Sequence, residues 1–155
     1  MQMQKITPFL WYDGQAEEAA KFYKAIFPNS KIVRVIPFNE AGPGPAGTAM
    51  TVEFQLAGLT FVALNGGPVY KFTEAISFVV NCENQEEVDH YWTKLSAGGS
   101  EVQCGWLKEK FGLAWQIVPT ALFKLLADPD RDKARRVMEA MFTMKKLDIG
   151  ARDAG

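Results

Sequence analysis

The stretch CGWLKEKFGLAWQIVP, residues 104–119, has the residue pattern of a β-hairpin. The charged residues 108–110 and Gly112 form a polar turn, and residues 113–118 alternate as a strand does. Gln116 is then a lone polar side chain on one face of that strand, with Ala114 and Val118 beside it and Leu113, Trp115 and Ile117 on the other face. Two interpretations remain open: the Gln116 amide is bonded to neighbouring backbone, or it is directed into a ligand pocket.

Composition limits the class of protein. The chain has 155 residues, of which 48% are hydrophobic, enough for one domain or two small subdomains whose core needs no disulfide. Cys82 and Cys104, with no signal-peptide pattern and no long apolar run, predict a cytoplasmic protein outside the membrane. The two cysteines are either free thiols or a disulfide. A net charge of −1 without a basic cluster argues against nucleic acid or membrane as a partner.

The first part of the chain has the order strand, helix, three strands. Residues 6–12 predict a strand, and residues 15–27 predict a helix that carries Glu17 and Glu18 in its first turn. Three further strands are expected at 32–38, 48–56 and 59–65. Residues 39–47, NEAGPGPAG, predict a mobile hairpin loop, for which a lid is one interpretation.

The same order returns in the second part. Residues 75–82 predict a strand, Asn84 caps a helix with Glu87 as its capping-box partner, and residues 101–106 predict a strand that leads into the hairpin. A shift of about 69 positions lays residues 17–18 on 86–87 and residues 22–23 on 91–92. The pattern therefore indicates an internal repeat.

These elements predict an α+β fold. Paired βαβββ modules, about residues 5–68 and 74–119, are expected to form one curved mixed sheet with helices outside and a concave pocket inside. Residues 120–149 predict a C-terminal helical segment, so that residues 1–155 form a single domain. Its longer helix is expected to begin at Asp128 and to carry an apolar stripe that packs in the core or against another subunit. The stripe consists of Ala134, Val137, Met138, Met141 and Met144.

Several segments resemble the PhnB-like branch of the vicinal oxygen chelate superfamily, which also contains glyoxalases and bleomycin-resistance proteins. Members of this branch often carry the name 3-demethylubiquinone-9 3-methyltransferase. The resemblance implies the glyoxalase/bleomycin resistance fold and a homodimer, in some members with swapped modules. The segments that carry it are PFLWYDGQAEEAAKFY, FPNSK, FVALNGGP, AISFVV, EEVD, CGWLKEKFGLAWQIVP and MEAMFTMKKLDI.

The resemblance also supplies a test for metal. Metal-dependent members place His or Glu at four inward-facing strand positions, which fall here near Pro8, Asn65, Ser77 and Gln116. None of the four is an imidazole or a carboxylate, the donors that Zn, Fe, Ni and Mn require. We therefore expect no metal and no cofactor at this site. The only histidine, His90, is predicted to face solvent from the second helix.

We expect the pocket to bind a small organic ligand. Strand alternation predicts that Phe61, Ala63 and Asn65 face this pocket. Val62 and Leu64 are then expected on the opposite face, against the helices. The proposed contacts are polar for Asn65, Ser77 and Gln116 and aromatic for Trp11, Trp106 and Phe111.

The alternative function is an enzyme. It is either a methyltransferase, as the family label suggests, or a metal-dependent lyase or dioxygenase that uses unexpected ligands. The Gly-rich loop and the acidic strand end of common S-adenosylmethionine sites are missing, and Gly42, Gly44 and Gly47 lie between strands among prolines. We therefore interpret the label as a name passed on by similarity. Unpaired strands at the sheet edges and the apolar stripe of the C-terminal helix are surfaces that a partner usually covers. They therefore predict a homodimer.

Overall fold

The computed structural model describes residues 4–150 of the chain. The chain divides into two compact units between Phe72 and Thr73. Among the described residues, no helix is both long enough and apolar enough to cross a bilayer.

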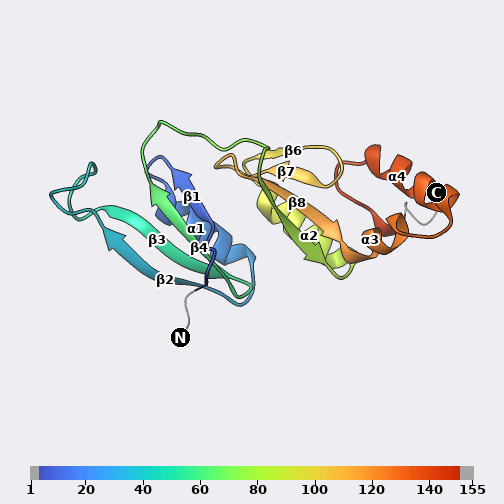
Figure 1. The fold of residues 1–155 in the computed structure, drawn as a ribbon, viewed down its shortest axis with the longest axis horizontal. Helices are drawn as coiled ribbons and strands as arrows, with labels where there is room; N and C mark the ends of the chain where they lie inside the picture. The colour runs from blue at the N-terminus through green and yellow to red at the C-terminus, as the bar shows by residue number, and fades with distance from the viewer. Residues whose placement is uncertain (1–3, 151–155) are drawn as a thin grey trace. The chain divides into compact units, whose positions relative to one another are not determined.

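The first unit is one helix and a four-stranded sheet. The sheet has the strand order β1-β4-β3-β2, in which β1 runs parallel to β4 and the other pairs are antiparallel (Figure 1). The elements are β1 (Phe9–Tyr12), α1 (Ala16–Ile26), β2 (Ser30–Pro37), β3 (Ala49–Leu56) and β4 (Leu59–Asn65).

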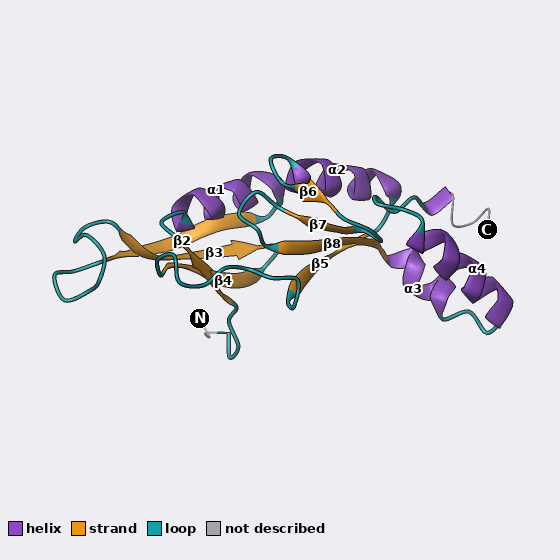
Figure 2. Ribbon diagram, turned by 90° about the horizontal axis from the view of Figure 1, so that it is seen from above, coloured by secondary structure: helices purple, strands orange, loops and turns teal. Residues whose placement is uncertain are grey.

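Helix α1 covers one face of this sheet (Figure 2). The ring of Tyr23 packs on Phe54 with centroids 5.8 Å apart, and Phe54 stacks on Phe61 at 5.4 Å. Phe61 and Ala63 are buried under the helix, so Val62 and Leu64 face away from it. The predicted assignment of the two faces of β4 was therefore wrong. Both faces of this strand are apolar, and a period of two residues does not identify the face that a helix will cover.

The second unit repeats the order of elements. Its sheet has the strand order β5-β8-β7-β6, with β5 parallel to β8. The α+β class is confirmed, and the pairing of the two modules into one curved sheet and one domain stays a prediction. The elements are β5 (Ser77–Cys82), α2 (Gln85–Ser96), β6 (Ser100–Glu101), β7 (Trp106–Lys108) and β8 (Ala114–Pro119).

The repeat has different offsets in its helices and strands. The buried positions of α2 lie 69 residues after those of α1, as in Tyr23 and Trp92. The buried residues that end β1 and β5, Tyr12 and Cys82, lie 70 residues apart. The strand offset therefore pairs Pro8 with Phe78, whereas the shift of about 69 positions would have paired it with Ser77. A slip of one residue moves every side chain of a strand to the opposite face.

Asn84 caps α2 as predicted. Its side chain accepts a hydrogen bond from the Glu87 N–H at 2.9 Å, and the Glu87 carboxylate accepts one from the Glu83 N–H at 3.3 Å. This exchange satisfies N–H groups that the first turn of a helix leaves without an intrahelical partner. The same helix exposes His90 to solvent, which confirms that prediction.

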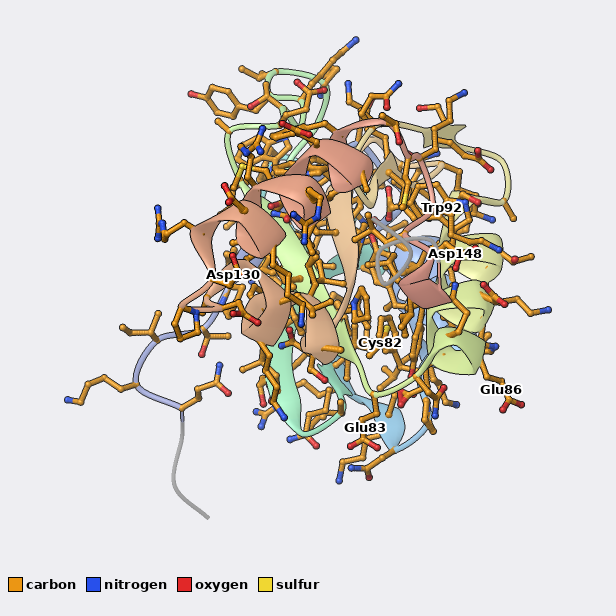
Figure 3. All side chains as sticks on the ribbon, turned by 90° about the vertical axis from the view of Figure 1, so that its right-hand side faces the viewer. Cys82, Glu83, Glu86, Trp92, Asp130 and Asp148 are labelled. Carbon is orange, nitrogen blue, oxygen red and sulfur yellow. The ribbon has the colours of Figure 1, made fainter. Side chains whose placement is uncertain are left out.

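The C-terminal residues form α3 (Thr120–Leu126) and α4 (Arg131–Phe142). The N-cap of α4 is Asp130, labelled in Figure 3, and not Asp128 as predicted. The Asp130 carboxylate accepts hydrogen bonds from the N–H groups of residues 132 and 133. Val137 is buried in a cluster with Val118, Leu122 and Leu147, and Met141 and Met144 pack against it. Ala134 and Val137 of the apolar stripe are therefore core of this unit, Met141 and Met144 are partly buried beside it, and Met138 is 45% exposed.

After α4 the chain returns to the start of α2. The Gln85 side chain donates to the Leu147 carbonyl at 3.0 Å and accepts from the Ile149 N–H at 2.8 Å. The N–H groups of Cys104 and Gly105 donate to the carbonyls of residues 144 and 145. Leu147 is completely buried as a result.

The turn of the β7–β8 hairpin contains a buried carboxylate. Glu109 is 2% exposed, and its Oε1 accepts hydrogen bonds from the N–H groups of Phe111 at 2.8 Å and Leu113 at 3.0 Å. The sequence predicted this residue in a polar turn, and its burial was not predicted. The hydrogen bonds explain its burial, because the carboxylate satisfies backbone donors of the turn itself.

Replacing Glu109 with alanine is expected to destabilise the protein by roughly 2–5 kcal/mol, because two backbone donors lose their acceptor. Urea unfolding measures the difference. Glu109→Gln keeps an acceptor oxygen and is expected to lose less, and Lys110→Ala, at an exposed neighbour, is expected to lose almost nothing. Equal stability of Glu109→Ala and Lys110→Ala would contradict the role assigned to this carboxylate.

Candidate functional site

Two of the predicted ligand contacts meet on the face of the second sheet that also carries Val118, which packs against α3 and α4. The Gln116 Nε2 donates to Ser77 Oγ at 2.9 Å, across the parallel pair β5–β8. Trp106 lies opposite Gln116 in the β7–β8 ladder, and all three side chains are half-buried. The Gln116 amide therefore has a side-chain partner on an accessible sheet face.

The first sheet has a groove on its own helix-free face. Its volume is about 380 Å³, within the range of small-molecule sites. Arg34 Nε and Glu53 Oε1 form an ion pair across it at 3.0 Å, and Phe9 is 59% exposed at its wall. The groove is lined by Gln4, Thr7, Phe9, Lys31, Val33, Arg34, Glu53, Gln55, Thr60 and Val62. The sequence signal for it was weak, since polar residues alternate with buried ones in β3 as in any half-exposed strand.

Asn65 does not share a face with this groove. Its Oδ1 accepts from the Ala16 N–H at 2.9 Å, and its Nδ2 donates to the Ala49 carbonyl at 3.0 Å. The side chain thus ties the end of β4 to the start of α1 and of β3. By strand register the counterpart of Asn65 in the second sheet is Pro119, and that of Gln116 is Val62. The alignment that made Asn65 and Gln116 equivalent was therefore wrong.

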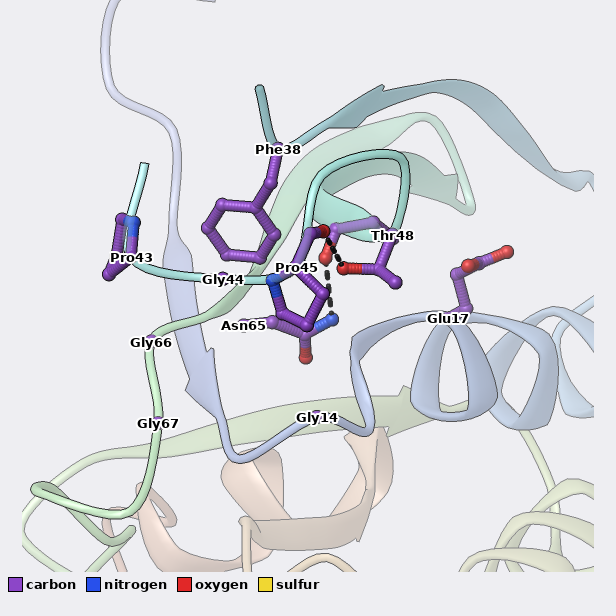
Figure 4. A pocket seen from close by; sticks show the side chains of 11 residues that line it. Gly14, Glu17, Phe38, Pro43, Gly44, Pro45, Thr48, Asn65, Gly66 and Gly67 are labelled. Carbon is purple, nitrogen blue, oxygen red and sulfur yellow. Dashed lines mark hydrogen bonds between the residues drawn. The ribbon is translucent and has the colours of Figure 1, made fainter. Parts of the chain in front are cut away.

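A second cavity lies beside Asn65, with a volume of about 370 Å³ (Figure 4). The segment 38–48, whose residues 39–47 were predicted to be a mobile loop, covers it, and Gly42 and Gly44 lie against the buried ring of Phe38. Hydrogen bonds join the Phe38 N–H to the Thr48 carbonyl and the Gly47 N–H to the Phe38 carbonyl. The cavity is lined by Gly14, Glu17, Phe38, Pro43, Gly44, Pro45, Thr48, Ala49, Asn65, Gly66 and Gly67.

Trp11 holds the segment that follows β4. Its Nε1 donates to the Gly67 carbonyl at 2.9 Å, and its ring makes an edge contact with Tyr70 at 4.9 Å between centroids. Gly66 lies directly against the indole, where an added Cβ would be 2.3 Å from a ring atom. The geometry thus gives Trp11, predicted as a wall of the ligand pocket, a structural role in anchoring this segment.

Phe111 lies in the hairpin turn, where its N–H is bonded to Glu109 and the Lys110 ammonium is 5.4 Å from its ring centroid. It is half-buried. Trp106, in contrast, lies on β7, so the two aromatic residues of this unit occupy different parts of the hairpin. They do not form one wall.

A metal site and a reactive thiol each set requirements for the titratable groups of the described residues. Within residues 4–150, no group of three His, Cys, Asp or Glu side chains is placed to hold a metal ion. Cys82 and Cys104 are free thiols and not a disulfide. Burial, with the nearby Glu87 carboxylate, raises the pKa of Cys82 to about 12, and partial burial raises the pKa of Cys104. Both thiols are therefore protonated near neutral pH and weakly nucleophilic.

Comparisons with known proteins agree on the fold. A profile of the family described as 3-demethylubiquinone-9 3-methyltransferase matches residues 4–118, which end before α3. A putative 3-demethylubiquinone-9 3-methyltransferase, PhnB protein, from Bacillus cereus is 36% identical, with a TM-score of 0.69 over 76% of this chain and 100% of that chain.

Two more distant structures show the same fold. Protein PA1353 from Pseudomonas aeruginosa is 20% identical, with a TM-score of 0.63 over 76% of this chain and 98% of that one. The genomically encoded fosfomycin resistance protein FosX from Listeria monocytogenes is 16% identical, with a TM-score of 0.58 over 83% and 100%. No curated protein matches the chain.

Gly66→Ala is expected to destabilise the protein by about 1–3 kcal/mol, because the new methyl group overlaps the Trp11 ring. A double-mutant cycle measured by urea unfolding isolates this contact. In a Trp11→Ala background the same glycine substitution is expected to cost little. An equal cost in both backgrounds would show that the conformation of the glycine, and not the indole, sets the requirement.

Proposed function

Because the chain belongs to the 3-demethylubiquinone-9 3-methyltransferase family, the PhnB-like branch of the vicinal oxygen chelate superfamily, we propose that it is a cytoplasmic protein that binds a small organic molecule without a metal. The two free thiols support a reducing compartment. The groove on the helix-free face of the first sheet is the observation that carries the proposal. We assign no reaction to the site.

The groove combines apolar walls with an excess of positive charge. Phe9 and Val62 offer apolar surface, while Lys31 and Arg34 stand against the single carboxylate of Glu53. The Arg34 side chain is 63% exposed, so its ion pair with Glu53 is screened by water and weak. Its guanidinium is therefore available to a ligand acceptor, and a ligand with an apolar body and a carboxylate fits this chemistry best.

We propose Ser77, Gln116 and Trp106 of the second sheet as contacts for a small ligand, separately from the groove of the first sheet. The hydroxyl and the amide are bonded to each other at 2.9 Å, and each keeps hydrogen-bonding capacity for a polar ligand atom. They are weak donors for transition metals, which supports binding without metal. The indole of Trp106 adds apolar contact area.

Benzoate is a suitable probe of the groove, because it joins an apolar ring to one carboxylate. In amide NMR spectra it is expected to shift signals of β3 and β4. Arg34→Gln is expected to weaken benzoate binding about tenfold, the value of one charge-assisted hydrogen bond. Arg135→Gln is the matched control, because Arg135 is equally exposed, at 64%, and also pairs with a carboxylate.

Unchanged benzoate affinity in Arg34→Gln would contradict the proposed groove. Methyl transfer from S-adenosylmethionine by the purified protein would favour the enzymatic alternative instead. Stoichiometric transition metal in protein purified without chelator would contradict binding without metal.

We further propose that the protein is a homodimer, with exchange of modules between subunits as one arrangement. Strand β2 is an outer strand of its sheet, and Val33, Val35 and Ile36 on it are 38–45% exposed. Exposed apolar edges of this kind are usually covered by a partner.

Light scattering is expected to give about twice the chain mass of 17.3 kDa at micromolar concentration. Val35→Lys is expected to shift the mass toward the monomer, since a lysine on an edge strand opposes pairing. Val69→Lys, at an apolar residue that is even more exposed but lies outside the strand, is the control. A monomeric unmodified protein would refute the dimer.

A further inference from the structure

The cavity beside Asn65 shares no residue with the groove. Three segments form it: the turn before α1, the loop at 38–48 and the end of β4 (Figure 4). Its volume of about 370 Å³ suits a small organic molecule.

Several glycines line this cavity, so parts of its wall are backbone without side chains. Gly44 packs on the Phe38 ring and Gly66 on the Trp11 ring, so both are needed for the shape of the wall. Gly14 and Gly67 differ, because a Cβ on either would have no described heavy atom beyond its chain neighbours within 4 Å. Both have positive φ, 79° and 94°, which disfavours any side chain there. Space is therefore open beside the Cα atoms of these two glycines.

Asn65 supplies the polar group of the cavity. An asparagine side chain accepts two hydrogen bonds and donates two. Among residues 4–150, Asn65 uses one acceptor position for Ala16 and one N–H for Ala49. One lone pair and one N–H remain on the same planar amide. A ligand with an adjacent donor and acceptor, such as an amide or lactam, complements this pair.

The charge of the side chains that line the cavity limits the charge of a ligand that can bind there. Of the described residues that line the cavity, none is a cation, and the one charged side chain is the Glu17 carboxylate at the exposed rim. An anion would enter without a countercharge, which is unfavourable. Phe38, Pro43 and Pro45 supply the apolar part of the wall.

We propose that this cavity is a second binding site, for a small neutral molecule with an apolar body and an amide or lactam group. It goes beyond the proposed function and does not depend on it. The two sites are expected to bind ligands of different charge. The groove is lined by cations and favours an anion, whereas this cavity is lined by none among the described residues and favours a neutral molecule.

Three probes of nearly equal shape test the proposal: benzamide is neutral, benzoate is an anion and benzamidine is a cation. Benzamide is expected to shift the backbone amide signals of Gly14, Gly44, Gly66 and Gly67. Benzoate is expected to leave these four signals unchanged, and benzamidine is expected to bind there more weakly than benzamide. Tighter binding of either ion at these glycines, or no shift with benzamide at millimolar concentration, would overturn the proposal.

Variants locate the contact. Asn65→Asp keeps the shape and the acceptor for Ala16 but removes the N–H, and it is expected to weaken benzamide binding about fivefold. Unchanged signals of residues far from the cavity would show that this variant is folded, and Asn65→Ser repeats the test with a neutral side chain. Undiminished benzamide affinity in both folded variants would overturn the role of the amide.

Glu17→Arg is expected to admit benzoate to the cavity, whereas Glu18→Arg, one position further along α1 and outside the lining, is not. If both substitutions changed benzoate binding at the cavity equally, the proposed role of Glu17 at its rim would be wrong. Arg34→Gln separates the two sites, because it is expected to weaken benzoate at the groove and to leave benzamide at this cavity unchanged. Loss of benzamide binding in Arg34→Gln would refute the second site and leave the proposed function standing.

Discussion

The packing of one helix against one face of the first four-stranded sheet is the constraint on which both proposed sites depend. In the first unit, Tyr23 of α1 rests on Phe54, and Phe54 rests on Phe61. An apolar sheet face must be covered, and one helix of this length covers one face. The opposite face keeps a mixture of apolar and charged side chains, and the groove that we propose as the ligand site lies there.

The same packing separates two kinds of binding surface. Side chains on the helix-free face meet Lys31 and Arg34, whereas Asn65 lies where β4 ends against the start of α1. The first environment favours an anionic group, and the second has polar donors and acceptors without a cation. A fold of this family can therefore offer sites of different chemistry on one small sheet, which agrees with the general finding that function resides in sites and not in folds.

The C-terminal helices also stabilise the second unit, and they lie outside the residues that match the family profile. They bury Val118, and the returning segment is fixed to α2 by the Gln85 amide and to the loop before β7 by two backbone hydrogen bonds. Gly105 is required beneath this segment, since an added Cβ would be 2.9 Å from Leu147. Contacts of this kind stabilise the second unit without forming part of either proposed site.

The sequence by itself determined the local features of this protein. The alternation of residues 113–118, the helical period of α1 and α2 and the cap at Asn84 depend on neighbours a few positions apart, and they yield the α+β class and the order of elements. The sequence also predicted that Ser77 and Gln116 share a pocket, and the register of β5 and β8 brings the two side chains together. Only the tertiary structure decided which face of β4 the helix covers, because Phe61 and Val62 are both apolar. It also decided the partners of Asn65, since Ala16 is 49 positions away in the chain. The burial of Glu109 is a different case, because its donors are only two and four positions away, but no residue pattern marked the turn conformation that brings them to one oxygen. Contacts between residues far apart in the chain leave no periodic trace in it, and for that reason the sites could be predicted only in part.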